Sequence, residues 1–470
     1  MTLPTPSYSL SWAQSVTLEA DSGDLLLQAY ARNALRLRQP DAALRHLVAL
    51  LGRGGLNADA LCQAVLQQAP GADPARLYYL LTLVANKALL RYTVTQQGQP
   101  LASLEPLAAT FQFEPRVATQ RYQLSRFACL RRLGTDMVVE CPLGHARMVL
   151  HDARAASLVA LLSQARTAAE LAAELPGLDE ITVAAFITLL HNAHAAFAVD
   201  ADGALPEDTD APLQQCAFHD LLFHSRSRAG RHDEPMGASF RWASQVRPLP
   251  AVKPPMSNRR ITLEPPKESL NTPFVEVIEA RRSQSQAGTT PLRLAQLSAL
   301  LYHAARIKAV HEPDPAQLHA YAATQRPSAS GGAIHAMELY LTVTRCEGLA
   351  PGFYHYDPLA HALEQLAELG PDHHRLLQAA CQATGIAQPP DLLIAMAARF
   401  QRTSWKYQSI AYALILKDVG ALYQQLYLVA TALRLAPCAL GGGDSDLFAR
   451  LAGTDYYAET TVGEFSVSGA

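Results

Sequence analysis

The chain has 470 residues, more than one hydrophobic core usually serves, so two or three domains are expected. Apolar residues make up 49% of it and the mean hydropathy is +0.01, both typical of soluble globular proteins. The net charge of −3 gives no general reason to expect nucleic acid or an anionic membrane as a partner.

Cysteine usage and the N-terminus favour a cytoplasmic location. Seven cysteines are scattered without a Cys-x-x-Cys pair, so neither a zinc site nor a disulfide framework is expected, and a reducing compartment fits. The N-terminus has no basic segment followed by an apolar core, and no stretch reaches about 18 uninterrupted apolar residues. The sequence therefore predicts a cytoplasmic protein with no membrane segment and no metal.

An imperfect repeat fills the first two hundred residues. The segment Tyr8 to Ser11 is echoed by Tyr122 to Ser125, and an Asp-Ala start at Asp41 is echoed at Asp152. Each copy has a short, partly alternating apolar stretch followed by helical patterns. Strands are expected within 25–30 and 137–150, and helices over 57–67, 75–90, 167–175 and 182–197. Two short strands with three small helices predict winged-helix-like domains, here over residues 1–110 and 118–200.

Winged helices often bind DNA, but the expected recognition helices lack the charge for it. The helix over 75–90 carries Arg76 and Lys87 as its cations, and the helix over 182–197 has no Lys or Arg. Phosphate contacts dominate DNA affinity, so a DNA-reading helix is normally far more basic. A peptide-binding or architectural role fits better, with an exposed strand edge able to accept an extended peptide.

Residues 201–270 are expected to be a linker and an arm. The stretch 201–212 is acidic and proline-bearing, which is typical of a linker. A polar and aromatic segment with His219, His224, His232 and Asp233 follows, but its spacing matches no usual metal-ligand motif. A docking or substrate-facing arm is the better interpretation, continued by extended proline-rich connectors.

From residue 271 to the C-terminus, helical and strand patterns mix. Helices are expected over 274–282, 294–303, 373–384 and 418–433, and strands over 338–344, 352–356, 392–397 and 460–467. The strands over 338–344 and 352–356 are expected to pair. Mixed strands enclosed by long helices predict an α+β domain.

Two motifs in this half suggest a bound ligand, a phosphate at the first and a flat or phosphorylated cofactor at the second. Arg281, Arg282 and Ser283 end a helix, and guanidinium groups form bidentate, charge-assisted bonds to phosphate. The run from Arg326 to Tyr340 contains Pro-Ser-x-Ser-Gly-Gly, where glycine lets the backbone approach a ligand closely. The alternatives are a solvated basic helix end and an ordinary turn.

Five blocks in order resemble the FMN-dependent nitroreductase superfamily, and within it the SagB/ThcOx-type azoline dehydrogenases. These enzymes oxidise thiazolines or oxazolines in ribosomally made peptide natural products. The blocks are ARRS, PSASGGAIHAMELYL, PGFYHYDP, WKYQSIAY and LKDVGALYQQLYLVATALRLAPCALGGGD. With the arm over 218–233, which resembles that family's pre-domain stretch, the resemblance covers about residues 213–470. The N-terminal repeat is similar to the paired winged-helix region of some members.

The resemblance implies a homodimer with FMN at the subunit interface. Arg281, Arg282 and Ser283 would bind the FMN phosphate and ribityl chain, while Ser328, Ser330 and Gly331 would line the isoalloxazine. The triple glycine, Gly441, Gly442 and Gly443, would let the backbone approach the phosphate end. Many relatives have a basic residue where this chain has Ser285, so FMN affinity could be lower or another cation could compensate.

The family's Lys-Tyr pair near the flavin matches Lys406 and Tyr407. Aromatising an azoline removes a proton from Cα and a hydride from the ring CH₂, and the cofactor takes the electrons. We favour Lys406 as the base or electrostatic partner with Tyr407 orienting, while Tyr407 as the base stays open. The alternative for both is structural, with a snorkelling lysine and a core tyrosine.

The resemblance also implies an azoline-containing precursor peptide as substrate and cyclodehydratase partners that make it. An NAD(P)H-dependent nitroreductase-like enzyme of small molecules is a second hypothesis, because the superfamily can use nicotinamide without a G-x-G-x-x-G motif. A third is a flavin-free peptide-binding scaffold, for which Ser285 is the one hint. The N-terminal repeat favours the peptide enzyme, since a small-molecule reductase would not need it.

Overall fold

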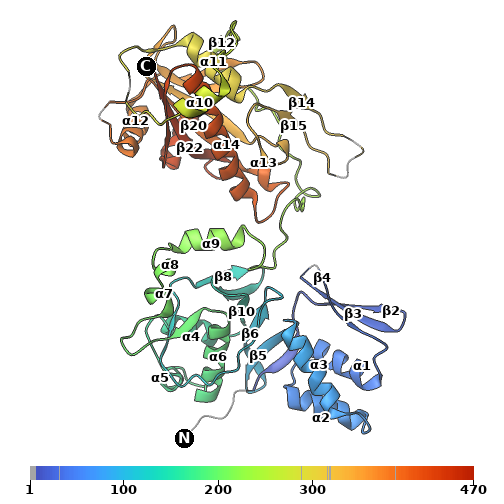
Figure 1. Ribbon diagram of the computed structural model, residues 1–470. Helices are drawn as coiled ribbons and strands as arrows, with labels where there is room; N and C mark the ends of the chain where they lie inside the picture. Colours follow the sequence, from blue (N-terminus) through green and yellow to red (C-terminus); the bar gives the residue numbers. More distant parts are fainter. Residues whose placement is uncertain are drawn as a thin grey trace. The chain divides into compact units, whose positions relative to one another are not determined.

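The computed structural model describes residues 7–30, 32–286, 288–314, 316, 319–386 and 388–469, and it divides into two compact units (Figure 1). The N-terminal unit spans Met1–Glu234 and the C-terminal unit Pro235–Ala470. The boundary falls inside the segment 201–270. Residues before it fold back onto the second repeat, where Glu207 accepts from the Arg126 backbone N–H at 2.8 Å and Asp233 pairs with buried Arg147.

The two repeats make equivalent backbone contacts. In each copy the first strand forms a bridge with the residue that precedes the cap of the second helix. The residue just after that strand bonds to the chain beyond the third helix. The pairs are Leu10 with Leu56 and Ala13 with Leu89 in the first copy, and Tyr122 with Arg166 and Ser125 with Ala195 in the second. The repeat seen in sequence is therefore also a structural repeat.

Side-chain caps start all three helices of each copy. The first copy has α1 (Ala42–Arg53), α2 (Ala58–Gln68) and α3 (Pro74–Asn86), and the second has α4 (Ala153–Leu161), α5 (Ala168–Glu174) and α6 (Glu180–Asn192). The caps are Asp41, Asn57, Asp73, Asp152, Thr167 and Asp179. Each cap satisfies a backbone N–H that the helix leaves unpaired and contributes about 1 kcal/mol.

The helix expected over 182–197 is wrong at its end. Helix α6 stops at Asn192, His194 adopts a left-handed conformation with φ of +55°, and β11 (Ala196–Ala198) follows. Strand β11 pairs with β7 (Tyr122–Leu124). An alanine-rich pattern fits either structure, and the tertiary pairing decides between them.

The two copies are joined by one continuous sheet. Its order is β1-β5-β6-β10-β9-β8, so β6 of the first copy lies antiparallel to β10 of the second. The strands are β1 (Ser9–Trp12), β5 (Leu90–Gln96), β6 (Gln99–Pro106), β8 (Cys129–Leu133), β9 (Asp136–Glu140) and β10 (Ala146–Leu150). A single apolar core spans both copies, which accordingly form one body rather than two independent ones.

A second, three-stranded sheet stands apart in the first copy. It consists of β2 (Thr17–Asp21), β3 (Asp24–Ala29) and β4 (Arg32–Leu37), with β3 in the centre. By chain order these strands correspond to β8, β9 and β10 of the second copy. Beyond the second repeat come α7 (Pro206–Thr209), α8 (Ala211–Gln214) and α9 (Phe218–Arg226).

The C-terminal unit is a seven-stranded antiparallel sheet with helices on both faces (Figure 1). Its strand order is β12-β19-β18-β16-β20-β22-β21, and the predicted pairing of 338–344 with 352–356 is confirmed as β16 with β18. The strands are β12 (Arg260–Thr262), β16 (Met337–Val343), β18 (Gly352–Asp357), β19 (Ala362–Ala367), β20 (Leu392–Arg399), β21 (Ala436–Leu440) and β22 (Glu459–Ser468).

Two apolar cores lie on the two faces of this sheet. One is formed with α11 (Leu294–Ala305) and α14 (Ala411–Ala432), the other with α12 (Pro371–Thr384) and α15 (Ser445–Ala452). Shorter elements include α10 (Phe274–Ala280), α13 (Phe400–Ser404), β13 (Leu292–Arg293), β14 (Ala309–His311), β15 (Ala323–Gln325) and β17 (Cys346–Glu347). The predicted α+β class is confirmed for this unit.

Helix α14 differs from its prediction because it begins at Ala411 rather than Asp418. Its buried side is Ile415, Val419, Leu422 and Leu426, an apolar stripe that starts before Asp418. Asp418 is therefore an interior helix residue. In the part of the chain that the structure describes, no helix, α14 included, is long and apolar enough to cross a bilayer.

Candidate functional site

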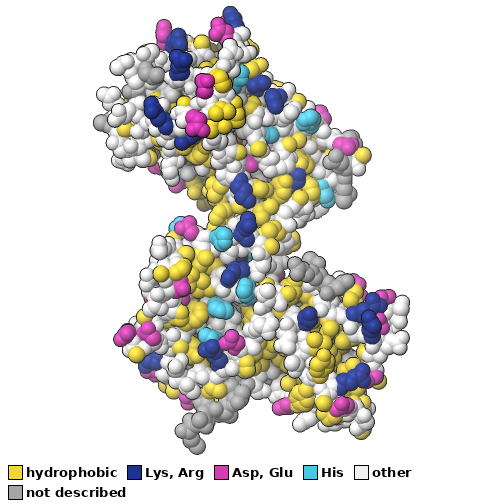
Figure 2. Space-filling view, in the orientation of Figure 1, with side chains coloured by type: hydrophobic (Ala, Val, Ile, Leu, Met, Phe, Trp, Pro, Cys, Tyr) yellow, Lys and Arg dark blue, Asp and Glu magenta, His cyan; other side chains and the backbone are white. Residues whose placement is uncertain are grey.

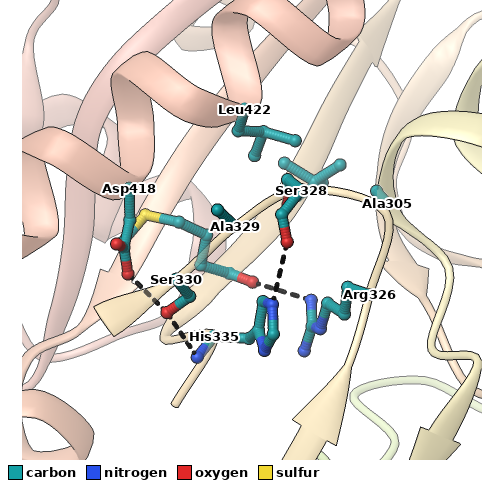
Figure 3. A pocket seen from close by; sticks show the side chains of 10 residues that line it. Ala305, Arg326, Ser328, Ala329, Ser330, His335, Asp418 and Leu422 are labelled. Carbon is teal, nitrogen blue, oxygen red and sulfur yellow. Dashed lines mark hydrogen bonds between the residues drawn. The ribbon is translucent and has the colours of Figure 1, made fainter. Parts of the chain in front are cut away.

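The glycine-rich loop between β15 and β16 is held in place by Asp418 of α14 (Figure 3). The Ser330 hydroxyl donates to one Asp418 oxygen at 2.6 Å, and the Gly331 backbone N–H donates to the other at 3.1 Å. Burial raises the pKa of Asp418, while these two hydrogen bonds oppose the shift. The carboxylate thus fixes two of the residues that the sequence assigned to the isoalloxazine.

His335 is a second anchor of the same loop. Its backbone N–H donates to the Ser330 hydroxyl at 2.9 Å, and its Nε2 lies 3.1 Å from the Ser328 carbonyl. A carbonyl can only accept, so Nε2 carries the proton and Nδ1 accepts from the Thr324 hydroxyl at 3.1 Å. Burial lowers the His335 pKa, which agrees with this neutral form.

Lys406 and Tyr407 lie directly over Gly332 of the loop. Gly332 adopts φ of +65°, and a Cβ added there would come within 2.7 Å of Lys406 Nζ and 2.6 Å of Tyr407 Oη. Any larger residue would therefore collide with both functional groups. The structure brings together the glycine-rich loop and the Lys-Tyr pair, which are far apart in sequence.

Aromatic rings surround the Lys406 ammonium. Lys406 Nζ lies 4.6 Å from the ring centre of Tyr321, 5.1 Å from that of Tyr407 and 6.0 Å from that of Phe240. It also donates to the Tyr321 hydroxyl at 2.5 Å. Contacts with three aromatic rings and one hydrogen bond thus hold Lys406 Nζ at the loop.

Residues 235–249, which we call the strap, form part of this surrounding. Gly237 and Gln408 exchange backbone hydrogen bonds, and the Phe240 N–H donates to the Lys406 carbonyl at 3.1 Å. The buried Trp405 indole donates to the Val246 carbonyl at 2.7 Å. This part of the segment expected as a linker and arm is therefore bonded along the Lys-Tyr segment.

The arginine-serine motif lies beside β21. Arg281 caps the C-terminus of α10 with its guanidinium 5.3 Å from the Tyr427 ring centre, and the Ser283 hydroxyl is 2.7 Å from the Tyr427 hydroxyl. The Gln284 N–H donates to the Pro437 carbonyl of β21 at 2.8 Å. Arg282 is exposed and Ser285 half-buried, so the motif presents cationic and hydroxyl groups to solvent.

The triple glycine follows β21 directly. Gly441 and Gly442 have open space where a side chain would be, whereas a Cβ at Gly443 would overlap the buried Glu464 carboxylate. Burial raises the pKa of Glu464. Within the described residues, no hydrogen bond or ion pair joins this group and the arginine-serine motif to the loop with its Lys-Tyr pair. One chain thus carries two separate groups of predicted site residues.

Sequence reasoning missed Asp418 and Tyr321. Asp418 had a signal, since it is a carboxylate next to the apolar stripe of α14, but it was assigned to the start of the helix. Tyr321 had no such signal, because the sequence over 312–320 has neither helical nor strand periodicity. Its link to Lys406 depends on a contact between distant segments.

Two family profiles match the chain. The profile described as cyanobactin oxidase ThcOx matches residues 122–233, which cover the second repeat through α9. The profile described as the nitroreductase family matches residues 278–467, from α10 to β22. The two matches thus fall in different units.

Two curated proteins and a solved structure are similar to parts of the chain. McbC of Escherichia coli, a microcin B17-processing protein, is 28% identical over 133 residues, which are 27% of this chain and 46% of McbC. The structure of the E. coli microcin synthetase McbBCD complex with truncated pro-MccB17 bound matches at 22% identity and a TM-score of 0.33, covering 53% of this chain and 90% of that chain.

The MJ1384 protein of Methanocaldococcus jannaschii, which is named as a nitroreductase, is 30% identical to this chain over 172 residues. The match covers 35% of this chain and 77% of that protein. Together with the family profile over residues 278–467, this similarity shows that the chain belongs to the nitroreductase family of oxidoreductases.

Proposed function

We propose that the protein is an FMN-dependent dehydrogenase that oxidises azoline rings to azoles in a ribosomally made precursor peptide. The observation that carries the proposal is the position of Lys406 and Tyr407 against Gly332. An amine that can accept a proton and a phenol that can donate a hydrogen bond, both at a loop built for close approach, are what proton removal beside a flat cofactor requires. McbC, named for microcin B17 processing, and the ThcOx profile support a peptide substrate.

The residues present fit FMN. Arg281 and Arg282 offer guanidinium groups to a phosphate, Ser283 and Ser285 add hydroxyls, and Gly441 and Gly442 leave open space for close backbone approach. Ser328, Ser330 and Gly331 would hold the ring, in a loop that Asp418 and His335 keep rigid. When bound, FMN supplies the two-electron acceptor of the oxidation.

The chain's own residues would handle the proton. The Lys406 amine takes the proton from the azoline Cα, while the ring CH₂ gives up a hydride, so the azoline loses two hydrogens in all. Tyr407 orients the ring through its hydroxyl. The Phe240 and Tyr321 rings lie beside Lys406 Nζ and restrict its position.

A homodimer would bring the two groups of site residues together. Among the described residues of one chain no hydrogen bond or ion pair joins the arginine-serine group to the loop group, and FMN between two subunits would contact one group from each. Exposed apolar side chains support such an interface. They include Phe274 and Val275 of α10, 67% and 68% exposed, and Tyr412 and Leu416 of α14. Figure 2 shows apolar side chains in yellow on the surface of the C-terminal unit.

The N-terminal unit would bind the precursor peptide at the free edge of β4. In the second copy the corresponding strand, β10, is covered by β6 in antiparallel register. In the first copy β4 pairs with β3 alone among the described strands. An extended peptide could therefore add to β4 as β6 adds to β10. Cyclodehydratase enzymes would supply the azoline rings.

Oxidation of an azoline-containing peptide by wild type, Lys406→Ala and Tyr407→Phe tests this function. We expect all three to retain FMN, and kcat to fall roughly 100- to 10,000-fold for Lys406→Ala, the usual contribution of a general base. Tyr407→Phe should lose less. Equal activity of all three proteins would refute the role of Lys406 and Tyr407. No oxidation by the wild type would refute the proposed function.

A further inference from the structure

The Tyr321 hydroxyl connects Lys406 to the glycine-rich loop. It accepts a hydrogen bond from Lys406 Nζ at 2.5 Å and donates its own proton to the Gly332 carbonyl at 3.0 Å. Gly332 is the residue whose missing side chain leaves room for Lys406 and Tyr407. One phenol thus links the ammonium group and the loop backbone beneath it.

The direction of these bonds orients the lysine. The phenol proton points to the Gly332 carbonyl, so an oxygen lone pair faces Lys406. A lysine side chain has a flexible four-carbon stem and about 2 kcal/mol of rotamer entropy, so it needs contacts with other residues to hold one position. The Tyr321 ring, 4.6 Å from Nζ, adds a cation–π contact from the same residue.

Neighbouring segments support Tyr321 in this position. Its ring centre lies 6.2 Å from that of Trp405, which is bonded to the strap through Val246. The adjacent Ala322 carbonyl accepts from Arg402 Nη2 at 3.1 Å, and Arg402 also binds the Ile334 carbonyl at the far end of the loop. The backbone at Tyr321 is therefore fixed to the same helix, α13, that precedes Lys406.

We propose that Tyr321 is a positioning residue that acts through Lys406, holding Nζ at the loop where the substrate proton is removed. The inference rests on the proposed function for its kinetic consequence, and on geometry alone for the contact itself. Losing the hydroxyl leaves the aromatic ring in place but frees the nitrogen to rotate. Proton removal then becomes slower while peptide binding is unchanged.

The kinetic test is Tyr321→Phe in the FMN-loaded full-length protein. We expect kcat for azoline oxidation to fall roughly 10- to 100-fold, as misplacement of a reacting group by about 1 Å does, with KM within about threefold. In a Lys406→Ala background, Tyr321→Phe should cost less than twofold in the rate of flavin reduction by the peptide. A full additional loss in that background would show that Tyr321 does not act through Lys406.

A second readout does not depend on the reaction. The chain has six lysines, so acylation of each by a small amine-reactive ester can be followed by peptide mass spectrometry. We expect Lys406 to be labelled several-fold faster in Tyr321→Phe than in wild type. Unchanged labelling would show that Tyr321 does not hold Lys406. If labelling is faster in the variant but the wild type does not oxidise azolines, the contact stands and the proposed function is wrong.

Tyr354→Phe is the matched control. The Tyr354 hydroxyl also donates to a backbone carbonyl, that of Ala350 at 2.8 Å, but it has no lysine partner among the described residues. Both substitutions remove a hydrogen bond from a tyrosine hydroxyl to a backbone carbonyl, worth about 1 kcal/mol. Tyr321→Phe removes in addition the bond from Lys406, which is the contact under test. If Tyr354→Phe changed kcat and Lys406 labelling as much as Tyr321→Phe, the effect would be general loosening and the inference would be wrong.

Discussion

Asp418 holds the glycine-rich loop in its conformation. It accepts from both Ser330 and Gly331 and is buried enough for its pKa to be raised. Removing a buried acceptor leaves its donors unsatisfied, which costs about 1–3 kcal/mol. The loop would lose the conformation that these two hydrogen bonds hold, and with it the proposed surface for the flavin ring.

We expect Asp418→Ala to weaken FMN binding roughly tenfold or more, as measured by quenching of flavin fluorescence on titration. Asp418→Asn keeps one acceptor oxygen and should lose less. Asp446→Ala is the control, since that carboxylate lies in the first turn of α15. Equal affinity of wild type and Asp418→Ala would mean that the loop is held by His335 without the carboxylate.

Glu105 in β6 makes a pH-dependent contribution to stability. Its side chain is 1% exposed, and burial raises its pKa from 4.5 to about 7 despite the Gln14 N–H and Arg91 nearby. Between pH 4.5 and 7 the folded state keeps the proton that the unfolded state has released. Stability from this group is therefore full below pH 4.5 and is lost as the pH rises towards 7.

The predicted loss is roughly 3 kcal/mol across that window, at about 1.4 kcal/mol per pKa unit. Glu105→Gln should remove this part of the pH dependence. Between pH 4.5 and 7.5, the free energy of unfolding measured by urea titration should fall less for this variant than for the wild type. The exposed Glu114→Gln is the control. Parallel pH profiles for wild type and Glu105→Gln would contradict the assignment.

At the scale of elements, β4 is expected to receive the peptide. Ala34 is the unpaired residue of an irregularity between β3 and β4, so proline there removes none of the paired positions while its ring obstructs the edge. Ala34→Pro should weaken binding of the precursor peptide at least tenfold in fluorescence anisotropy. Ala20→Pro on the opposite edge strand, β2, should bind like wild type. Weaker peptide binding by Ala20→Pro than by Ala34→Pro would instead indicate that the peptide binds at β2.

Helix α10 is expected to lie in the dimer interface. Val275→Asp places a charge on an exposed apolar residue and should both dissociate the dimer in size-exclusion chromatography with light scattering and lower FMN content. Leu359→Asp, at a residue 53% exposed in the turn between β18 and β19, is the control. A monomeric wild type that binds FMN fully would refute the shared site.

Helices were the elements most readily predicted, because their capping residues and apolar stripes are local. Asn57 and Thr167 begin helices as expected. Strands β19 and β21 were not predicted, since their stability comes from pairing with distant strands. The end of α6 was wrong for the same reason, because β11 exists through its pairing with β7.

For the whole molecule, the order of motifs was sufficient to predict the family and the α+β class. The contacts that create the site were not predictable in the same way. The Ser330–Asp418 and Lys406–Tyr321 bonds join residues more than eighty positions apart, and no periodicity records them. The division after Glu234 likewise depends on α7 to α9 packing on the second repeat.

The most direct test of the central claim is an anaerobic titration of the FMN-loaded protein with an azoline-containing peptide, followed by flavin absorbance and peptide mass. We predict that the flavin absorbance bleaches in proportion to the peptide added and that the peptide loses two hydrogens, without any nicotinamide. A flavin that stays oxidised with the peptide but bleaches with NADPH would contradict this account and identify a small-molecule reductase.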